Sequence, residues 1–229
     1  MKTFFHLGGK VPDYRGIMKA HGDFYIGDRL IPAARVVIAE QTHSDRAHIC
    51  LEADCGAGFG SHAQIAGTDG LLTNIPGQYL LIRTADCTPV LFVDKFSRAV
   101  GAVHSGREGT RKNIVGKAAR LMQTQYGIPA GDLLAHVGAG ICHRHYQVDE
   151  STWDEYNNSM RDQGFFPNLD LHRHIDIRRG IFQQLIAAGI PFQNIEQECV
   201  CTYESPEYFS WRRDRTNNRQ INLIGMEHE

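Results

Sequence analysis

Short apolar runs crowd the first half of the chain, and polar, turn-forming residues separate them. The runs are rich in Val, Ile and Leu, which favour strands over helices at these lengths. They predict strands over residues 35–39, 70–73, 79–84, 90–93 and 99–104.

The second half of the chain adds helical periodicity. Apolar residues recur at helical spacing over 113–126, and Gly127 with Pro129 ends this predicted helix. Ser151 or Thr152 is a candidate N-cap for a helix running toward Met160. Another helix is expected over 171–188, and further strands over 133–137, 195–200 and 220–224. Strands first, then helices mixed with strands, predict an α+β fold with mixed sheets rather than regular βαβ winding.

The length and composition indicate one folded domain. The 229 residues can bury one good hydrophobic core, and 42% hydrophobic residues argue against disorder. No internal repeat, low-complexity tract or Pro/Ser-rich linker interrupts the chain. We therefore expect a single domain spanning residues 1–229.

Charge and hydropathy exclude several classes of function. The formal charge is −2, from 24 basic and 26 acidic residues. The sequence has no stripe of basic residues, so it gives no indication of a nucleic-acid partner. No apolar run approaches the roughly 20 residues that cross a bilayer. The first residues, Met1 to His6, lack the apolar stretch of a signal peptide, so we expect a cytoplasmic protein whose six cysteines are reduced. The oligomeric state is not indicated.

Three residues at predicted strand ends form a candidate metal site. His43 follows the first predicted strand, Cys87 follows the third, and His104 ends the fifth. Strand ends in one sheet can converge, and one thiolate with two imidazoles suits zinc. Three protein ligands leave a fourth position open, as in catalytic zinc sites. An alternative from the same residues is a Cys87–His104 nucleophile pair without metal.

Five segments, in order, resemble one family. They are Gln41-Thr42-His43-Ser44, Thr68 to Thr73, Thr84 to Val90, Ala102 to Gly106, and Cys201-Thr202 followed by Phe209 to Asp214. Together they are similar to the YfiH-like laccase-domain family of purine nucleoside phosphorylases, formerly called multicopper polyphenol oxidases. The resemblance runs from about residue 35 to the C-terminus.

The resemblance implies a fold, a metal and a set of reactions. The fold is a layered α/β/β/α sandwich, and the metal is zinc on His43, Cys87 and His104. The implied reactions are phosphorolysis of adenosine, inosine, guanosine and methylthioadenosine, and deamination of adenosine. The substrates are thus small molecules, a purine nucleoside and phosphate. Editing of peptidoglycan precursors has also been proposed for bacterial members.

Two segments depart from the family pattern. The family usually has Ala-Gly-Trp-Arg-Gly after the third zinc ligand, whereas this chain has Ser105-Gly106-Arg107-Glu108-Gly109, which shifts the arginine by one position. The family's paired cysteines before Tyr-Glu-Val are replaced here by Arg144-His145. Those cysteines are therefore dispensable in this chain, or its chemistry is altered.

Residues near the expected metal are candidates for catalysis and substrate binding. Asp86 and Cys87 are the candidate catalytic residues; Asp86 would orient a ligand histidine or move a proton, unless it only caps its own turn. Gln41, Arg107 and Arg212 are the candidate substrate-binding residues. Arg107 lies in a Gly-containing turn before the helix expected near Asn113, which suits phosphate. Both arginines equally fit a structural reading, as exposed or ion-paired residues.

The remaining cysteines show no ligand spacing by themselves. Cys199 and Cys201 alternate along a predicted strand and are expected to face one side of a sheet. Cys142, Cys199 and Cys201 are therefore expected to be dispensable for chemistry, and one zinc is expected per chain.

Four functions remain open from the sequence. The first is a zinc-dependent purine nucleoside phosphorylase with adenosine deaminase activity. The alternatives are a metal-dependent amidohydrolase acting on peptidoglycan precursors, a copper-dependent polyphenol oxidase, and a non-catalytic zinc-binding protein. Copper binds such ligands more tightly than zinc, so it is a possible occupant of the same site.

Overall fold

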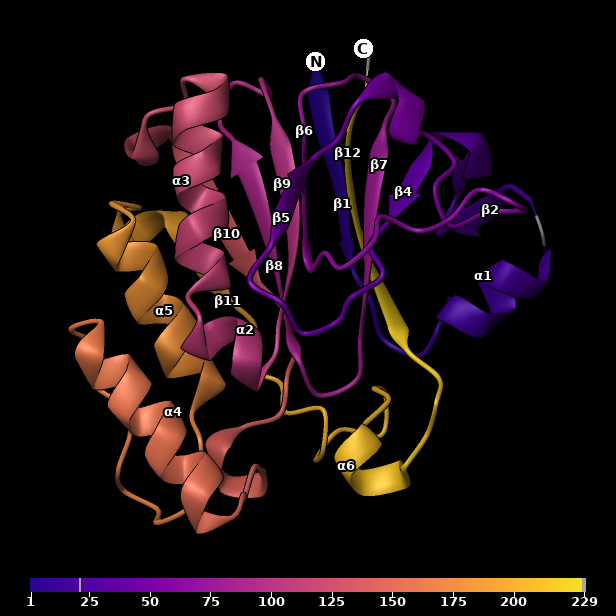
Figure 1. The fold of residues 1–229 in the computed structure, drawn as a ribbon. Coiled ribbons are helices and arrows are strands. Elements are labelled where there is room, and N and C mark those ends of the chain that lie inside the picture. Colours follow the sequence, from indigo (N-terminus) through magenta and orange to yellow (C-terminus); the bar gives the residue numbers. More distant parts are fainter. Residues whose placement is uncertain (21, 228–229) are drawn as a thin grey trace.

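Two β-sheets lie face to face in the computed structural model of the chain, which describes residues 1–20 and 22–227 (Figure 1). The four-stranded sheet has the order β1 (Lys2–Leu7), β12 (Gln220–Glu227), β7 (Tyr79–Thr84), β4 (Val36–Ile38). The six-stranded sheet has the order β11 (Ile195–Gln197), β10 (Leu133–Val137), β8 (Thr88–Asp94), β9 (Val100–Ser105), β6 (Gly70–Thr73), β5 (Ala47–Ile49). The pairs β4–β7, β5–β6 and β10–β11 are parallel and the others antiparallel, so both sheets are mixed.

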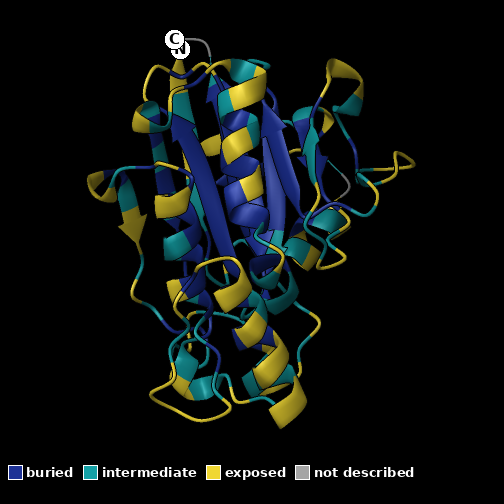
Figure 2. Ribbon diagram, turned by 60° about the vertical axis from the view of Figure 1, so that its left-hand side comes forward, coloured by how far each residue is buried: buried dark blue, intermediate teal, exposed yellow. Residues whose placement is uncertain are grey.

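Alternation along the strands divides the core into three parts, since successive side chains face opposite sides of a sheet. Leu80 and Ile82 of β7 meet Leu91 of β8 between the two sheets. Leu81 of β7 faces the other way and packs against Ile17. Val90 and its alternating neighbours in β8 pack under the helices. The central strands are therefore buried on both faces, and Figure 2 shows them as the dark blue centre of the molecule.

Helices cover both outer faces of the paired sheets (Figure 1). The six-stranded sheet is covered by α2 (Arg107–Arg111), α3 (Ile114–Tyr126), α4 (Glu150–Asp162) and α5 (Ile177–Ala187). A thinner layer, made of α1 (Tyr14–Ala20) and the hairpin of β2 (Phe24–Ile26) and β3 (Arg29–Ile31), covers the four-stranded sheet. The last helix, α6 (Trp211–Asp214), lies beyond the strand ends. The α+β fold with an α/β/β/α order of layers is confirmed.

Several predicted bounds were wrong for local reasons. The helix expected from residue 171 begins at Ile177, because the Asp176 side chain accepts a hydrogen bond from the backbone N–H of Arg179 and caps it. Asp149 caps α4 in the same way, in place of Ser151 or Thr152. The strand expected over 195–200 ends at Gln197. Cys199 is exposed and Cys201 buried, so the two do not share one face of a strand.

The elements that the apolar pattern did not predict are short or lie at an edge. They are β1, α1, β2, β3, β5, α2 and α6. The edge strand β1 is only partly buried, and buried and exposed positions do not alternate clearly along it. Its place in the sheet is set by pairing with β12, which a local pattern of apolar residues does not show. No helix in the described part of the chain is long and apolar enough to cross a membrane.

Candidate metal centre

The three predicted metal ligands meet where the ends of the two sheets come together. His43 follows β4, Cys87 lies in the turn between β7 and β8, and His104 is in β9. β4 and β7 belong to the four-stranded sheet, whereas β8 and β9 belong to the six-stranded sheet. The expectation that these strand ends share one sheet was wrong, because the chain crosses from one sheet to the other at residues 85–87.

The ligand atoms of the triad are close enough for one metal ion. Nε2 of His43 lies 3.9 Å from Sγ of Cys87, and the His43 and His104 rings have centroids 5.1 Å apart at 71°. All three ligand atoms lie within 4.8 Å of one another. Tetrahedral zinc with bonds of about 2.3 Å to sulfur and about 2.0 Å to nitrogen places such atoms about 3.5 Å apart. A small inward movement of His43, which is exposed, closes the difference.

Asp69 holds two of the ligands in place. Its carboxylate is fully buried and accepts hydrogen bonds from the backbone N–H groups of Thr42, His43 and Ser44, at 2.6 to 3.1 Å. Oδ1 also lies 2.8 Å from Nδ1 of His104. A carboxylate that accepts from Nδ1 leaves Nε2 of the imidazole free to bind a metal. The residue that orients a ligand histidine is therefore Asp69, and not Asp86 as the sequence suggested.

The electrostatics of the triad favour the ligand form of the cysteine. Burial opposes ionisation of the Cys87 thiol, but His104 and then His43 lower its pKa to about 6. Burial likewise opposes charge on His104, while Cys87 and Asp69 raise its pKa to about 9. Burial opposes charge on Asp69 too, yet the hydrogen bonds from His104 and Ser44 lower the pKa of this carboxyl. A thiolate, which is the form that binds metal, is thus favoured at neutral pH.

The backbone leaves room at the centre for a metal ion. A Cβ atom on Gly106 would lie 2.7 Å from Sγ of Cys87 and 3.2 Å from Cδ2 of His43. Only glycine lets the strand end approach the thiol this closely. The donor set, the orienting carboxylate and this space together fit zinc, with the fourth position facing a cavity.

Three non-glycine residues of the centre have left-handed backbone conformations. They are Gln41 and His43, both with φ of 60°, and Asp86 with φ of 87°. Such conformations cost on the order of 1–3 kcal/mol each and persist where the surroundings fix them. At His43 the surrounding structure is the Asp69 carboxylate, which binds three successive N–H groups.

The triad lies on the wall of a cavity of about 910 Å³. The cavity is rich in arginine, which makes it suitable for an anionic or phosphate-containing ligand. The arginines are Arg83, Arg107, Arg212, Arg215 and Arg219. Tyr14, Tyr146 and Trp211 add aromatic surface.

Arg107 and Arg111 differ in what they face. Both pair with Glu108, at 3.1 Å from Arg107 Nε and 2.8 Å from Arg111 Nη2. Only Arg107 lines the cavity, whereas Arg111 also reaches Glu155 of α4. The segment expected as a turn before a helix at Asn113 contains the short helix α2, and the Asn113 side chain caps α3 by accepting from Gly116.

Gln41 and Asp86 line the cavity, but most of their hydrogen-bonding groups are bound to other residues of the chain. The Gln41 amide accepts from the backbone N–H of Arg83 at 2.8 Å and donates to its carbonyl at 2.7 Å. Asp86 accepts from the Thr202 hydroxyl and from the backbone N–H of Arg212, each at 2.7 Å. Both side chains therefore fix the cavity walls.

Arg212 and Arg213, adjacent in sequence, separate in space. Arg212 lines the cavity, with its guanidinium 5.2 Å from the centre of the Tyr146 ring. Arg213 turns away and donates to the carbonyls of Thr202, Tyr203, Ser205 and Tyr208. Of the two, only Arg212 is placed to contact a substrate.

Sequence reasoning missed several residues of the site. Asp69 lies in the family-like segment Thr68 to Thr73, directly before a predicted strand. This position was the signal that could have identified it as the residue that orients a ligand. Arg83, Arg215 and Arg219 had no signal, because single arginines without a motif are common in any chain.

Comparisons with known proteins identify the family of the chain. Residues 4–227 match a family described as multi-copper polyphenol oxidoreductase laccase. "Purine nucleoside phosphorylase ORF3" of Streptomyces griseus is 29% identical over 222 residues, covering 97% of this chain and 87% of its own length. "Purine nucleoside phosphorylase YlmD" of Geobacillus stearothermophilus is 32% identical over 204 residues, covering 86% and 74%.

Solved structures show the same fold. The crystal structure of YlmD from Geobacillus stearothermophilus has a TM-score of 0.79 at 31% identity, covering 86% of this chain and 76% of that one. The crystal structure of the Bacillus licheniformis hypothetical protein YfiH has a TM-score of 0.77 at 31% identity, covering 85% and 75%.

Proposed function

Because the chain belongs to the multi-copper polyphenol oxidoreductase laccase family, which it shares with relatives named purine nucleoside phosphorylase, we propose that it is a zinc-dependent purine nucleoside phosphorylase that also deaminates adenosine. The observation that carries the proposal is the triad of His43, Cys87 and His104 on the wall of an arginine-rich cavity. Adenosine, inosine, guanosine and methylthioadenosine are the substrates we expect.

Zinc would be held by Nε2 of His43, Sγ of Cys87 and Nε2 of His104. When bound in such a set it acts as a Lewis acid and lowers the pKa of water toward about 7, which suits deamination of adenosine by water to inosine and ammonia. Asp69 keeps His104 in the tautomer that can bind. Copper is the alternative occupant of the same ligands.

The cavity offers separate surfaces for phosphate and for the purine. Arg107 stands next to Gly106 at the metal end, and we assign it to phosphate. Tyr146 with Arg212 above its ring forms a flat, cationic surface that suits the purine. In phosphorolysis a phosphate oxygen forms a bond to the ribose C1′ while the bond to the purine nitrogen breaks, giving free base and ribose 1-phosphate.

Asp86 and Gln41 act mainly through other residues in this proposal. Asp86 joins the turn that carries Cys87 to Thr202 and to the start of α6, so it positions Arg212 at the cavity. Gln41 fixes Arg83 in the cavity wall. We further propose that the enzyme acts in the cytoplasm, where reducing conditions keep Cys87 as a thiol.

The test is chromatography of adenosine incubated with the zinc-loaded protein, with and without phosphate. Inosine should form in both samples, and adenine with ribose 1-phosphate only when phosphate is present. Arg107→Ala should raise the phosphate concentration needed for half-maximal phosphorolysis about tenfold or more, because a charge-assisted hydrogen bond to phosphate is lost. It should leave deamination largely unchanged. Arg111→Ala is the matched control, since it also pairs with Glu108 but faces α4.

Two outcomes would overturn the proposal. If adenosine gives neither product while a UDP-linked muramyl-serine precursor is cleaved, the protein is an amidohydrolase. If Arg107→Ala slows both reactions equally, the phosphate role of Arg107 is wrong. A multi-copper oxidase is less well supported, since the other two candidate ligand groups among the described residues contain one histidine each.

A further inference from the structure

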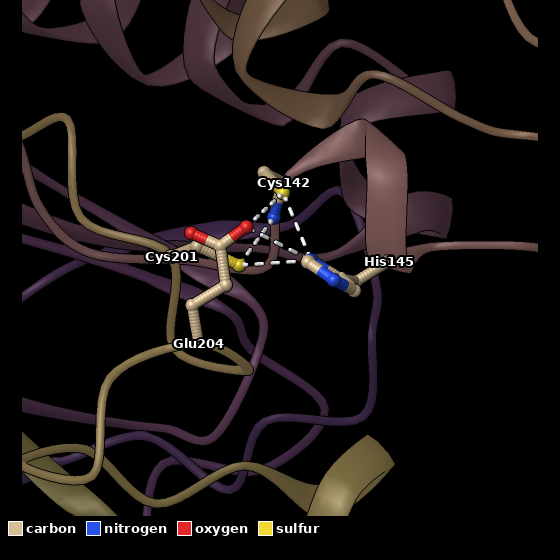
Figure 3. A group of neighbouring side chains, drawn as sticks. All are labelled: Cys142, His145, Cys201 and Glu204. Carbon is tan, nitrogen blue, oxygen red and sulfur yellow. Dashed lines mark hydrogen bonds and ion pairs between the residues drawn. The ribbon is translucent and has the colours of Figure 1, made fainter.

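A second group of metal-binding side chains lies outside the triad. Figure 3 shows Cys142, His145, Cys201 and Glu204 pointing toward one another from two separate loops. We propose that these four residues form a second, structural zinc site that clamps the two loops together. This proposal does not depend on the reaction catalysed at the first centre.

The spacing of the four ligand atoms matches a zinc tetrahedron. Nδ1 of His145 lies 3.3 Å from Sγ of Cys142, 3.8 Å from Sγ of Cys201 and 3.3 Å from Oε1 of Glu204. Sγ of Cys142 lies 3.9 Å from the same Glu204 oxygen. Zinc bonds of about 2.3 Å to sulfur and about 2.0–2.1 Å to nitrogen or oxygen give tetrahedron edges of about 3.3 to 3.8 Å. These four distances need shifts of only a few tenths of an ångström to close on an ion, and all four ligand atoms lie within 4.8 Å of one another.

Each loop contributes its two ligands from one tight turn. The backbone N–H of His145 donates to the carbonyl of Cys142 at 3.1 Å, and that of Glu204 donates to the carbonyl of Cys201 at 3.2 Å. In turns of this kind, side chains three residues apart lie on the same side. The sequence thus contains two ligand pairs with a two-residue gap, Cys-x-x-His and Cys-x-x-Glu, and the expectation that these cysteines show no ligand spacing did not recognise them.

The backbone holds the two turns side by side. Gly140 and Cys201 form a parallel β-bridge, and the N–H of Thr202 donates to the carbonyl of Gly140. The backbone N–H of Cys142 donates to Sγ of Cys201 at 3.3 Å, which fixes the position of that sulfur. The His145 ring stacks on Tyr203 with centroids 4.5 Å apart, which fixes its direction. The ligands are therefore oriented before any ion binds.

The charge of a filled site is balanced by a neighbouring side chain. Zinc with two thiolates and one carboxylate has a net charge of −1. Arg144, whose Nη2 lies 3.7 Å from Oε1 of Glu204, is placed to balance it.

Four protein ligands leave no open position, so the site is structural rather than catalytic. It joins the loop after β10, which lines the cavity with Ile141 and Tyr146, to the loop before α6, which holds the cavity residue Asp86. Tyr146 directly follows His145, and Thr202 directly follows Cys201 and binds Asp86. Zinc at this site would therefore stabilise the cavity without touching the substrate.

Metal content of the purified full-length chain tests the proposal. The protein is reduced, loaded with zinc, freed of excess and analysed by mass spectrometry of the elements. We expect two zinc ions per chain, one in Cys87→Ala, and none in Cys87→Ala with Cys142→Ala. The matched control is Cys199→Ala, because Cys199 is exposed, lies outside the group of four and has an Sγ that donates to the Gln197 carbonyl at 4.0 Å, so this variant should keep both ions.

A second readout covers variants that fold poorly. Zinc should raise the melting temperature of Cys87→Ala, because an ion that binds only the folded state stabilises it. Glu204→Gln, a substitution at a half-exposed side chain, should weaken binding at least tenfold without loss of fold. If Cys87→Ala binds no zinc and does not gain stability from it, or if Cys142→Ala and Glu204→Gln both bind zinc like wild type, the second site does not exist. A zinc count of one in wild type that is lost with Cys87→Ala leads to the same conclusion, and leaves the proposed function standing.

Discussion

Substitution of Asp69 by Asn should remove the carboxylate that orients His43 and His104 while hardly changing the volume of the side chain. Oδ1 of Asp69 serves His43 N–H and Nδ1 of His104, and Oδ2 serves the N–H groups of Thr42 and Ser44. The amide of Asn has one acceptor oxygen, so its NH₂ group must take the place of either Oδ1 or Oδ2 of Asp69. If it faces His104, the imidazole turns to the tautomer with a proton on Nε2, which cannot bind zinc.

The magnitude follows from the bonds that are lost. Either orientation leaves one or two buried backbone N–H groups unsatisfied, at about 1–3 kcal/mol each. We expect a loss of stability of about 2–6 kcal/mol, including the lost charge, which corresponds to a melting temperature lower by roughly 5–20 °C. Zinc affinity should fall about 10- to 100-fold, as for other carboxylates behind a ligand histidine.

Competition against a fluorescent zinc chelator measures the affinity, and calorimetry measures the melting. Asp54→Asn is the matched control, because Asp54 also accepts from a backbone N–H, that of Leu51, and from a histidine, His48. Neither Asp54 nor His48 belongs to the centre formed by His43, Cys87 and His104. If Asp69→Asn binds zinc within threefold of wild type, the orienting role is refuted.

Three further changes test other parts of the structure. Gly106→Ala should lower zinc affinity at least tenfold, because the new Cβ would lie 2.7 Å from the Cys87 sulfur, whereas Gly131→Ala, which meets nothing within 4 Å, should not. Cys87→Ala should abolish turnover of adenosine but melt within a few degrees of metal-free wild type; normal turnover would show that Cys87 is not a metal ligand. Burial raises the pKa of Glu198, and its Oε2 has no hydrogen-bond partner, so stability falls as the pH rises from the ordinary pKa of a glutamate to the raised pKa, and the full cost remains above it. Glu198→Gln should therefore raise the melting temperature at pH 7 and have little effect near pH 4, where both forms are neutral; an equal effect at both pH values would contradict this.

The central strands and the three long helices α3, α4 and α5 were predictable because their signal is local. The runs that became β7 and β9, and the helix that became α3, carry their own periodicity and caps, including Asn113 and the left-handed Gly127. The bounds of α4 and α5 were misplaced because the capping aspartates, Asp149 and Asp176, were not recognised before their helices. Short elements such as α2 have too few residues for any period to be visible.

The sequence by itself determined the fold class, the family and the three candidate ligands of the first centre, since each of them stands in a short linear motif. Only the tertiary structure decided that those ligands come from two stacked sheets, that Asp69 orients His104, and that scattered arginines share one cavity. The same holds for Cys142 and Cys201, which are 59 residues apart and meet through a single backbone bridge. The physical reason is that such groups contribute little until the sheets pack, so their proximity depends on long-range pairing that no local pattern of residues records.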